Sequence, residues 1–156
     1  LATAGRVVDM GVSDANNMGA AMAPAAVDTL IAHFRDTGRT PSDYDQIITG
    51  DLGLVGSRIL QELLQKNDYP LDEERYMDCG LKIFDPEDRV HAGGSGCGCS
   101  ATTLSAYILP KLRKGEWKRV LFMATGALLS PTTNQQGETI PGVAHAVVLE
   151  GGTEKC

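Results

Sequence analysis

Short apolar segments alternate with longer stretches of helical periodicity along this chain, and that order limits the folds open to it. Strong strand signals lie at residues 6–12, 46–49, 118–124 and 144–150. Weaker strand signals lie at 76–79 and 81–84. Because short connections place helices on the faces of a parallel sheet, this order predicts an α/β fold. We expect a mainly parallel sheet that is covered by helices and has one antiparallel addition.

Three apolar faces at helical spacing separate the strand signals. The first runs from Met18 to Phe34 and is followed by Gly38, a typical stop signal. Pro24 interrupts it, which leaves two alternatives: a kinked helix, or a helix that begins near Pro24. The other two faces predict helices over residues 54–66 and 100–114.

Length and composition restrict the classes of function. A chain of 156 residues with 42% hydrophobic residues fits a single domain, 1–156, and its first residue, Leu1, leaves open that it is part of a longer protein. The net charge of −6 argues against non-specific nucleic-acid binding, which needs a basic face. No segment approaches the roughly 18–20 uncharged apolar residues of a membrane-spanning helix. The four cysteines lack the spacing of a disulfide framework and are interpreted as reduced thiols.

A glycine-rich segment at 91–100 is the most distinctive motif. It precedes the helix predicted over 100–114, so its glycines could let backbone amides approach an anion such as a carboxylate. Close packing against another element explains the glycines equally well. The segment matches neither a phosphate-binding loop nor a dinucleotide-binding fingerprint. Segments 50–53 and 126–142 are expected to meet it at the carboxyl ends of the strands, where open α/β sheets bind ligands.

Cys97 and Cys99 in this segment admit several interpretations. A lowered thiol pKa near the start of a helix would make either a nucleophile, whereas a buried packing role is the commoner outcome. A zinc site would need about four ligands, and the spacing to His91 and Cys79 does not supply a known pattern. We therefore expect no metal and no cofactor.

Other polar side chains near the strand ends have both structural and functional interpretations. Asp51 could serve as a base or a ligand contact, or could cap a turn or helix. His145 and His91 could act as an acid or base, although a structural histidine is more common. Arg58 could meet a carboxylate ligand or remain a solvated residue on a helix surface.

Three long runs resemble the C-terminal half of the stage V sporulation protein AD family: TPSDYDQIITGDLG, DCGLKIFDPEDRVHAGGSGCGCSATTLSAYILPKL and KRVLFMATGALLSPTTNQQGETIPGVAHAVVLE. That family is similar in fold to thiolases and ketoacyl synthases. The resemblance implies one half of a two-half protein, in which each half is an α/β, five-stranded mixed sheet with helices and the site lies between the halves. It also implies that the helix from Ser100 onward exposes an apolar face when the other half is missing, which would favour a homodimer.

Where the related enzymes carry catalytic groups, this sequence departs from them. Gly50-Asp51-Leu52-Gly53 stands where ketoacyl synthases have His-Gln-Ala-Asn, and Gly93-Gly94-Ser95-Gly96 stands at their Gly-Asn-Thr-Ser. Ala124-Thr125-Gly126-Ala127 stands at the Cys-x-Gly-Gly-Gly of thiolases. These departures remove a proton carrier, an oxyanion donor and a nucleophile, so we expect a protein without acyltransferase activity.

The resemblance further implies binding of dipicolinic acid, with or without calcium, in spore formation and germination. The expected partners are other SpoVA proteins, and the expected location is the forespore cytoplasm, peripheral to the spore inner membrane. Asp78 is a further carboxylate that could matter if calcium binds. Two alternatives remain: an acyltransferase that uses His145 or Cys97 in new roles, and a docking scaffold for membrane partners. The expected ligand-binding residues are Asp51, Gly94, Ser95, Gly96, Cys97, Thr125, Gln136 and His145.

Overall fold

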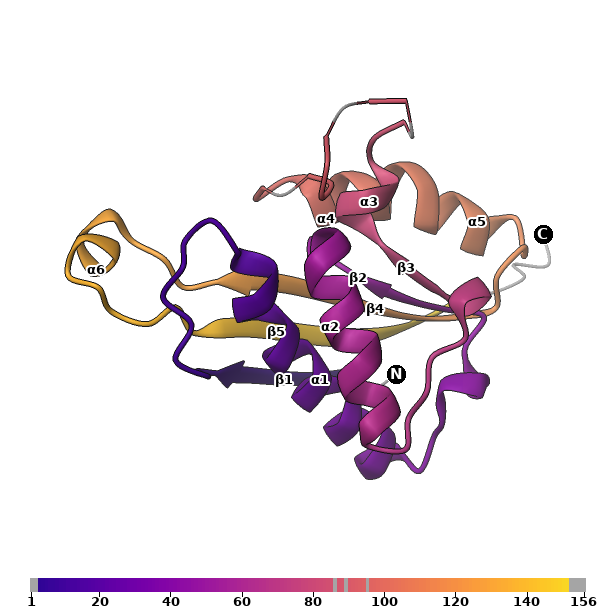
Figure 1. The fold of residues 1–156 in the computed structure, drawn as a ribbon. Helices are drawn as coiled ribbons and strands as arrows, with labels where there is room; N and C mark the ends of the chain where they lie inside the picture. The colour runs from indigo at the N-terminus through magenta and orange to yellow at the C-terminus, as the bar shows by residue number, and fades with distance from the viewer. Residues whose placement is uncertain (1–2, 86, 89, 95, 152–156) are drawn as a thin grey trace.

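A computed structural model describes residues 3–85, 87–88, 90–94 and 96–151 (Figure 1). Its strands form one five-stranded sheet in the order β1-β5-β4-β2-β3. β4 pairs in parallel with β2, which pairs in parallel with β3, whereas β5 is antiparallel to both β4 and β1. Four strands therefore share one direction and β5 opposes them, which confirms the expected mixed α/β sheet. The strands are β1 (Thr3–Val8), β2 (Gln46–Thr49), β3 (Tyr76–Asp78), β4 (Arg119–Ala127) and β5 (Gly142–Glu150).

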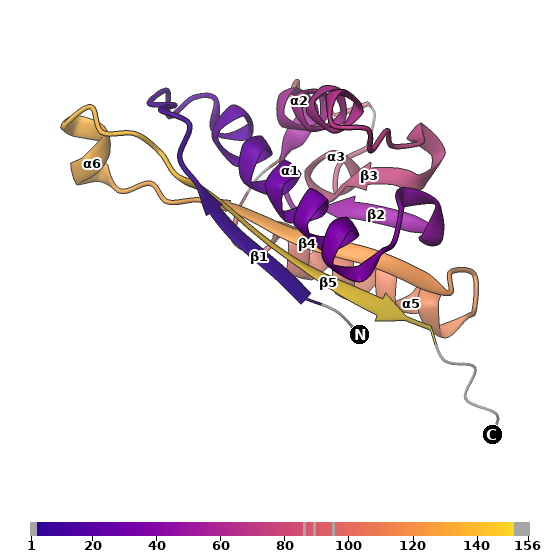
Figure 2. The same cartoon turned by 90° about the horizontal axis from the view of Figure 1, so that it is seen from below.

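Helices cover both faces of the sheet, as the view from below shows (Figure 2). α1 (Met18–Thr37) and α2 (Gly53–Lys66) lie on one face, and α4 (Cys99–Thr103) and α5 (Leu109–Arg113) lie on the other. Alternating residues of β4 divide between the two apolar cores, because successive side chains of a strand point to opposite faces. Within the described ranges, none of the helices is long and apolar enough to cross a membrane.

α1 forms one continuous helix through Pro24. The Asn17 side chain accepts a hydrogen bond from the Ala20 N–H at 3.3 Å, and Gly38 ends the helix with a left-handed φ of 66°. The alternative of a helix that begins near Pro24 is therefore wrong. α1 packs closely on α2 where Gly19 faces Gly56, since a Cβ on Gly19 would lie 2.6 Å from the carbonyl oxygen of Leu52.

The helix expected over 100–114 forms, but it is not regular. A π-helical segment, Leu104–Ile108, joins α4 to α5, and the Leu109 N–H donates to the Leu104 carbonyl five residues back. Pro110 provides a physical reason, because proline has no N–H to donate and its ring crowds the carbonyl four residues earlier. Such segments insert an extra residue into a helical turn.

Several boundaries differ from expectation. The strand signal at 81–84 is wrong, because its first two residues belong to α3 (Cys79–Lys82), which the Asp78 carboxylate caps by accepting the Gly80 N–H at 3.0 Å. The strand expected over 6–12 ends earlier, since Asp9 accepts the Gly11 N–H in a turn. The polar segment before β5 contains a short helix, α6 (Pro131–Gln135), which Ser130 caps.

Candidate functional site

The carboxyl ends of β2 and β4 meet at Asp51 and Thr125. The Thr125 hydroxyl donates to the Asp51 carboxylate at 2.8 Å, and the Asp51 N–H donates to the Thr125 hydroxyl oxygen at 2.9 Å. The Gly96 N–H reaches the second carboxylate oxygen of Asp51 at 3.4 Å. Asp51 thus bridges both strand ends and the glycine-rich segment. The residue at the N-terminal cap of α2 is Leu52 rather than Asp51, and its side chain makes no capping hydrogen bond.

Asp78 caps α2 instead, from the end of β3. One of its carboxylate oxygens accepts the Thr49 hydroxyl at 2.6 Å and the Leu52 N–H at 2.9 Å. The other accepts the N–H groups of Gly53 and Gly80, each at 3.0 Å. Burial raises the pKa of Asp78, while these donors favour its ionised form and oppose the rise. The turn that carries Asp51 is therefore fixed by a buried carboxylate whose role the sequence did not reveal.

A hydroxyl network extends from Asp78 toward α2. The Tyr76 hydroxyl lies 2.9 Å from the Thr49 hydroxyl and 3.0 Å from the Ser57 hydroxyl. Burial is the main cause that raises the pKa of Tyr76, so its phenol stays neutral at physiological pH. The network holds β2, β3 and α2 together behind the site.

Backbone hydrogen bonds hold the glycine-rich segment in place. The Gly94 N–H donates to the Gly80 carbonyl at 2.7 Å, and the Ala92 carbonyl accepts the Leu54 N–H at 2.8 Å. A Cβ on Gly94 would overlap the Phe84 ring. Gly96 has a φ of 148°, a conformation that residues with a side chain rarely adopt. These glycines allow both close contact and the unusual backbone path.

The Asp51–Thr125 pair lies in a cavity of about 520 Å³ between the glycine-rich segment, α1 and β4. Its wall combines apolar side chains, including Met22 and Phe122, with Asp51, Cys97 and Thr125. A second cavity of about 180 Å³ also touches Asp51 and is lined by the backbone from Ala92 to Gly94. Asp51 therefore contributes to two adjacent hollows at one end of the sheet.

The structure brings together only part of the expected site. Asp51, Gly96, Cys97 and Thr125 line the larger cavity, and Gly94 lines the smaller one. Ser95 lies outside the described residues. Two expected residues lie apart from the cavity: exposed Gln136 ends α6, and His145 on β5 packs its ring over Gly5.

The remaining candidates have the following positions. Cys97 is exposed, whereas Cys79 and Cys99 are buried. Burial raises the pKa of Cys99, which fits the packing role expected as the commoner outcome and argues against the alternative of an activated nucleophile at this thiol. His91 is exposed, and Arg58 lines a different cavity. The described residues contain no group of three or more side chains suited to hold a metal ion.

The polar groups that line the larger cavity are few. Among the described residues that line the larger cavity there is one carboxylate, one thiol and no histidine. Apolar walls with a few placed polar groups are typical of small-molecule sites.

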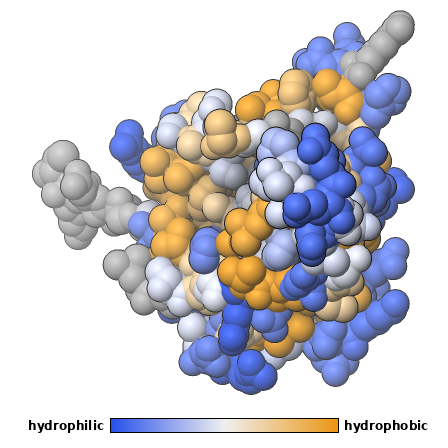
Figure 3. Space-filling model, turned by 90° about the vertical axis from the view of Figure 1, so that its left-hand side faces the viewer, coloured by the Kyte–Doolittle hydropathy of each residue, from blue (hydrophilic) through white to orange (hydrophobic). Residues whose placement is uncertain are grey.

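Apolar side chains surround this end of the molecule, where the space-filling view shows hydrophobic groups among hydrophilic ones (Figure 3). Met10, beyond the end of β1, is 68% exposed, and Leu128, beyond the end of β4, is 56% exposed. Phe84 beside Gly94 is 38% exposed. The candidate site thus opens at a partly apolar surface.

A family sequence model and a curated protein sequence both match this chain, and both carry the same description. The sequence model of the stage V sporulation protein AD (SpoVAD) family matches residues 1–150. The chain is 53% identical over 149 residues to stage V sporulation protein AD of Bacillus subtilis (strain 168). That match covers 96% of this chain but 44% of the relative, so the chain spans less than half the length of the curated relative it matches.

Proposed function

Because this chain belongs to the stage V sporulation protein AD family, we propose that it supplies one wall of a non-enzymatic ligand site that acts in sporulation. The proposed ligand is dipicolinic acid, a small aromatic dicarboxylate. The observation that carries the proposal is the cavity at Asp51 and Thr125, whose walls combine apolar side chains with few polar groups. Since the chain covers 44% of its relative, the rest of the longer protein would complete the site.

Charge determines the proposed form of the ligand. A dicarboxylate next to the Asp51 carboxylate, in a chain of net charge −6, would be repelled unless a cation lies between them. Calcium accepts six to eight oxygen ligands, and dipicolinate can supply several of them. The described residues offer no metal site of their own, so calcium would enter as part of calcium dipicolinate, with Asp51 as a protein ligand.

The apolar surface around the cavity supports a second role. Exposed Met10, Leu128 and Phe84 would suit contact with partner proteins, for which we propose other SpoVA proteins at the spore inner membrane. This scaffold role is compatible with ligand binding. It would place the chain in the forespore cytoplasm, at the membrane surface.

Calorimetric titration tests the proposal. Dipicolinate is added, with and without calcium, to this chain and to the full-length Bacillus subtilis relative, with an acyl-coenzyme A as the comparison ligand. We expect the full-length protein to bind dipicolinate more tightly when calcium is present, and Asp51→Asn to remove that dependence on calcium. Gln136→Ala, which lies away from the cavity, is the matched control. Binding of the acyl-coenzyme A without binding of dipicolinate would contradict the proposal and favour an acyltransferase.

A further inference from the structure

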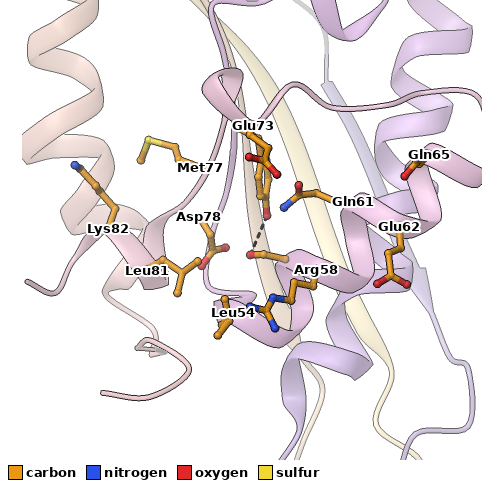
Figure 4. A pocket seen from close by; sticks show the side chains of 12 residues that line it. Leu54, Arg58, Gln61, Glu62, Gln65, Glu73, Met77, Asp78, Leu81 and Lys82 are labelled. Carbon is orange, nitrogen blue, oxygen red and sulfur yellow. Dashed lines mark hydrogen bonds between the residues drawn. The ribbon is translucent and has the colours of Figure 1, made fainter. Parts of the chain in front are cut away.

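A third cavity, of about 610 Å³, lies along β3, the outer strand of the sheet, and does not include Asp51. All three residues of β3 line it, and its two walls come from α2 and α3 (Figure 4). Leu54 and Leu81 contribute apolar surface from the two walls, and Met77 contributes apolar surface from the strand between them. This groove has the sheet edge as its floor.

Among the residues that the structure describes, β3 pairs only on its inner side. It is the last strand of the sheet, and Tyr76, Met77 and Asp78 pair with Ile47, Ile48 and Thr49 of β2. In a parallel pair, backbone groups of alternate residues point away from the partner strand. The outer edge of β3 therefore presents backbone N–H and C=O groups to the groove, where an added strand could bond to them.

Asp78 is the charged groove residue whose carboxylate is hydrogen-bonded within the fold, whereas four other charged side chains along the groove have no ion-pair partner among the described residues. Arg58 and Glu73 form no ion pair with another described residue, and neither does Glu62. Lys82 lies 4.9 Å from the centre of the Tyr107 ring but likewise lacks a carboxylate partner among the described residues.

These charges have an order along β3. Glu73 begins the turn that precedes the strand, whereas Lys82 ends the helix that follows it. Arg58 lies in the second turn of α2, which starts near the carboxyl end of β2. A bound peptide with an acidic group toward the end of β3 would complement Arg58 and Lys82. A basic group toward the beginning of β3 would complement Glu73.

We propose that this groove binds an extended peptide segment of a partner protein as a sixth strand on β3. An apolar side chain of the peptide lies between Leu54, Met77 and Leu81. An acidic side chain faces Arg58 and Lys82, and a basic side chain faces Glu73. The proposal does not rest on the dipicolinate proposal, and the groove and the cavity at Asp51 share no lining residue.

The test uses two blocked peptides, Lys-Thr-Leu-Thr-Val-Thr-Glu and its reverse sequence, which present the same side chains in parallel and antiparallel directions. Binding to the 156-residue chain is followed by NMR, together with amide hydrogen exchange at residues 76–78. We expect one direction to bind with a Kd below about 1 mM and to slow exchange at the β3 edge. The same peptide with N-methyl groups at alternate residues keeps its side chains but cannot pair, so it should lose binding.

Charge reversal provides the second part of the test. Arg58→Glu should raise the Kd of whichever peptide binds by roughly tenfold, a change of about 1.4 kcal/mol in binding free energy. A peptide with Lys in place of its Glu should recover the loss. Lys66→Glu, on the same helix but outside the cavity, is the matched control, and thermal unfolding checks that each variant is folded.

Three results would overturn the proposal. The first is absence of binding by both peptides up to about 1 mM, which would mean that the short, charged edge protects against pairing. The second is equal binding by the N-methylated peptide. The third is equal affinity of Arg58→Glu and the parent chain. Unchanged dipicolinate titration in Arg58→Glu would separate this site from the one at Asp51.

Discussion

Asp51 and Thr125, 74 positions apart in the chain, exchange two hydrogen bonds at the carboxyl ends of β2 and β4. The hydroxyl of Thr125 donates to the carboxylate and accepts from the backbone N–H of the same aspartate. No single-residue change at Thr125 preserves both bonds except replacement by another hydroxyl residue. The pair therefore couples the stability of these two strand ends to the position of the Asp51 carboxylate, which we propose as a ligand of calcium.

Thr125→Val should destabilise the fold by about 1–2 kcal/mol, because the Asp51 N–H loses its acceptor while the shape of the side chain is nearly kept. Urea unfolding measures this change. Thr125→Ser should recover most of it, and Thr132→Val at an exposed position of α6 is the control. Equal stability of Thr125→Val and the control would show that the pair contributes nothing to folding.

Asp78→Asn should cost roughly 3 kcal/mol, since the amide nitrogen cannot accept the hydrogen bonds that one carboxylate oxygen now accepts. The turn at 50–53 should loosen as well, which amide exchange at Leu52 would detect. Asp36→Asn, at an exposed position of α1, should change stability by less than about 0.5 kcal/mol. A similar small effect at Asp78 would contradict its role as the α2 cap.

Gly96→Ala should destabilise the chain by about 1–2 kcal/mol, because its φ of 148° is unfavourable for a residue with a Cβ. Gly98→Ala is the matched change in the same segment. Its φ is −95° and a Cβ there would have no neighbour closer than 4.0 Å, so the cost should stay within about 0.5 kcal/mol. Chemical unfolding of both variants compares them, and equal costs would rule out backbone strain as the cause.

The buried imidazole of His33, whose Nε2 lies 2.6 Å from the Tyr44 hydroxyl, should make stability depend on pH. Burial, followed by the charge of Arg39, lowers the pKa of His33 below its usual 6.5. Below pH 6.5 the unfolded chain therefore binds a proton that the native chain does not, and stability should fall as the pH decreases toward the folded pKa.

Urea unfolding at pH 7.5, 6.5 and 5.5 tests this expectation. His33→Gln should reduce the difference between these values even if it lowers stability overall. His91→Gln, at an exposed position, should keep the slope of the parent chain. A parent chain equally stable at all three values would refute the expectation.

Thiol labelling should distinguish the exposed cysteine from the buried ones by their rates of reaction. Cys97 is exposed and should react with iodoacetamide in the folded chain, whereas burial raises the pKa of Cys79 to about 12 and keeps it unreactive. Cys156→Ser removes the thiol that lies outside the described residues. Mass spectrometry locates the label, and calcium dipicolinate should slow labelling of Cys97, which lines the proposed cavity. Faster reaction of Cys79 than of Cys97 would contradict this.

Elements with strong local signals were predictable from sequence. β2 and α1 carry apolar patterns of the right period, and α1 has both a capping asparagine and a terminal glycine. The signal at 81–84 failed because a short apolar segment does not distinguish strand from helix. There the Asp78 cap, together with contacts from distant segments, decides the outcome.

In the candidate site, too, some residues could be placed from local sequence signals and others depended on contacts between distant segments. Asp51 and Thr125 could be grouped because Asp51 follows β2 and Thr125 lies near the carboxyl end of β4, at the same edge of the sheet. His145 could not be placed without knowing which side of β5 it occupies, since neighbouring residues of a strand point in opposite directions. Asp78 could not be recognised as the cap of α2 because its partners Thr49, Leu52 and Gly53 lie 25 to 29 positions earlier in the chain, and only folding brings them to it.

The π-helical turn at Leu104–Ile108 has a consequence for alignments within the family. An extra residue in a helix rotates everything after it by about 100° relative to everything before it. A homologue that lacks one residue here could keep the same sheet and the same helix ends, yet its matching positions would be offset on one side of the turn. Side chains of α4 that face the cavity and side chains of α5 that face β4 should therefore be aligned as two separate blocks, with any gap placed between them.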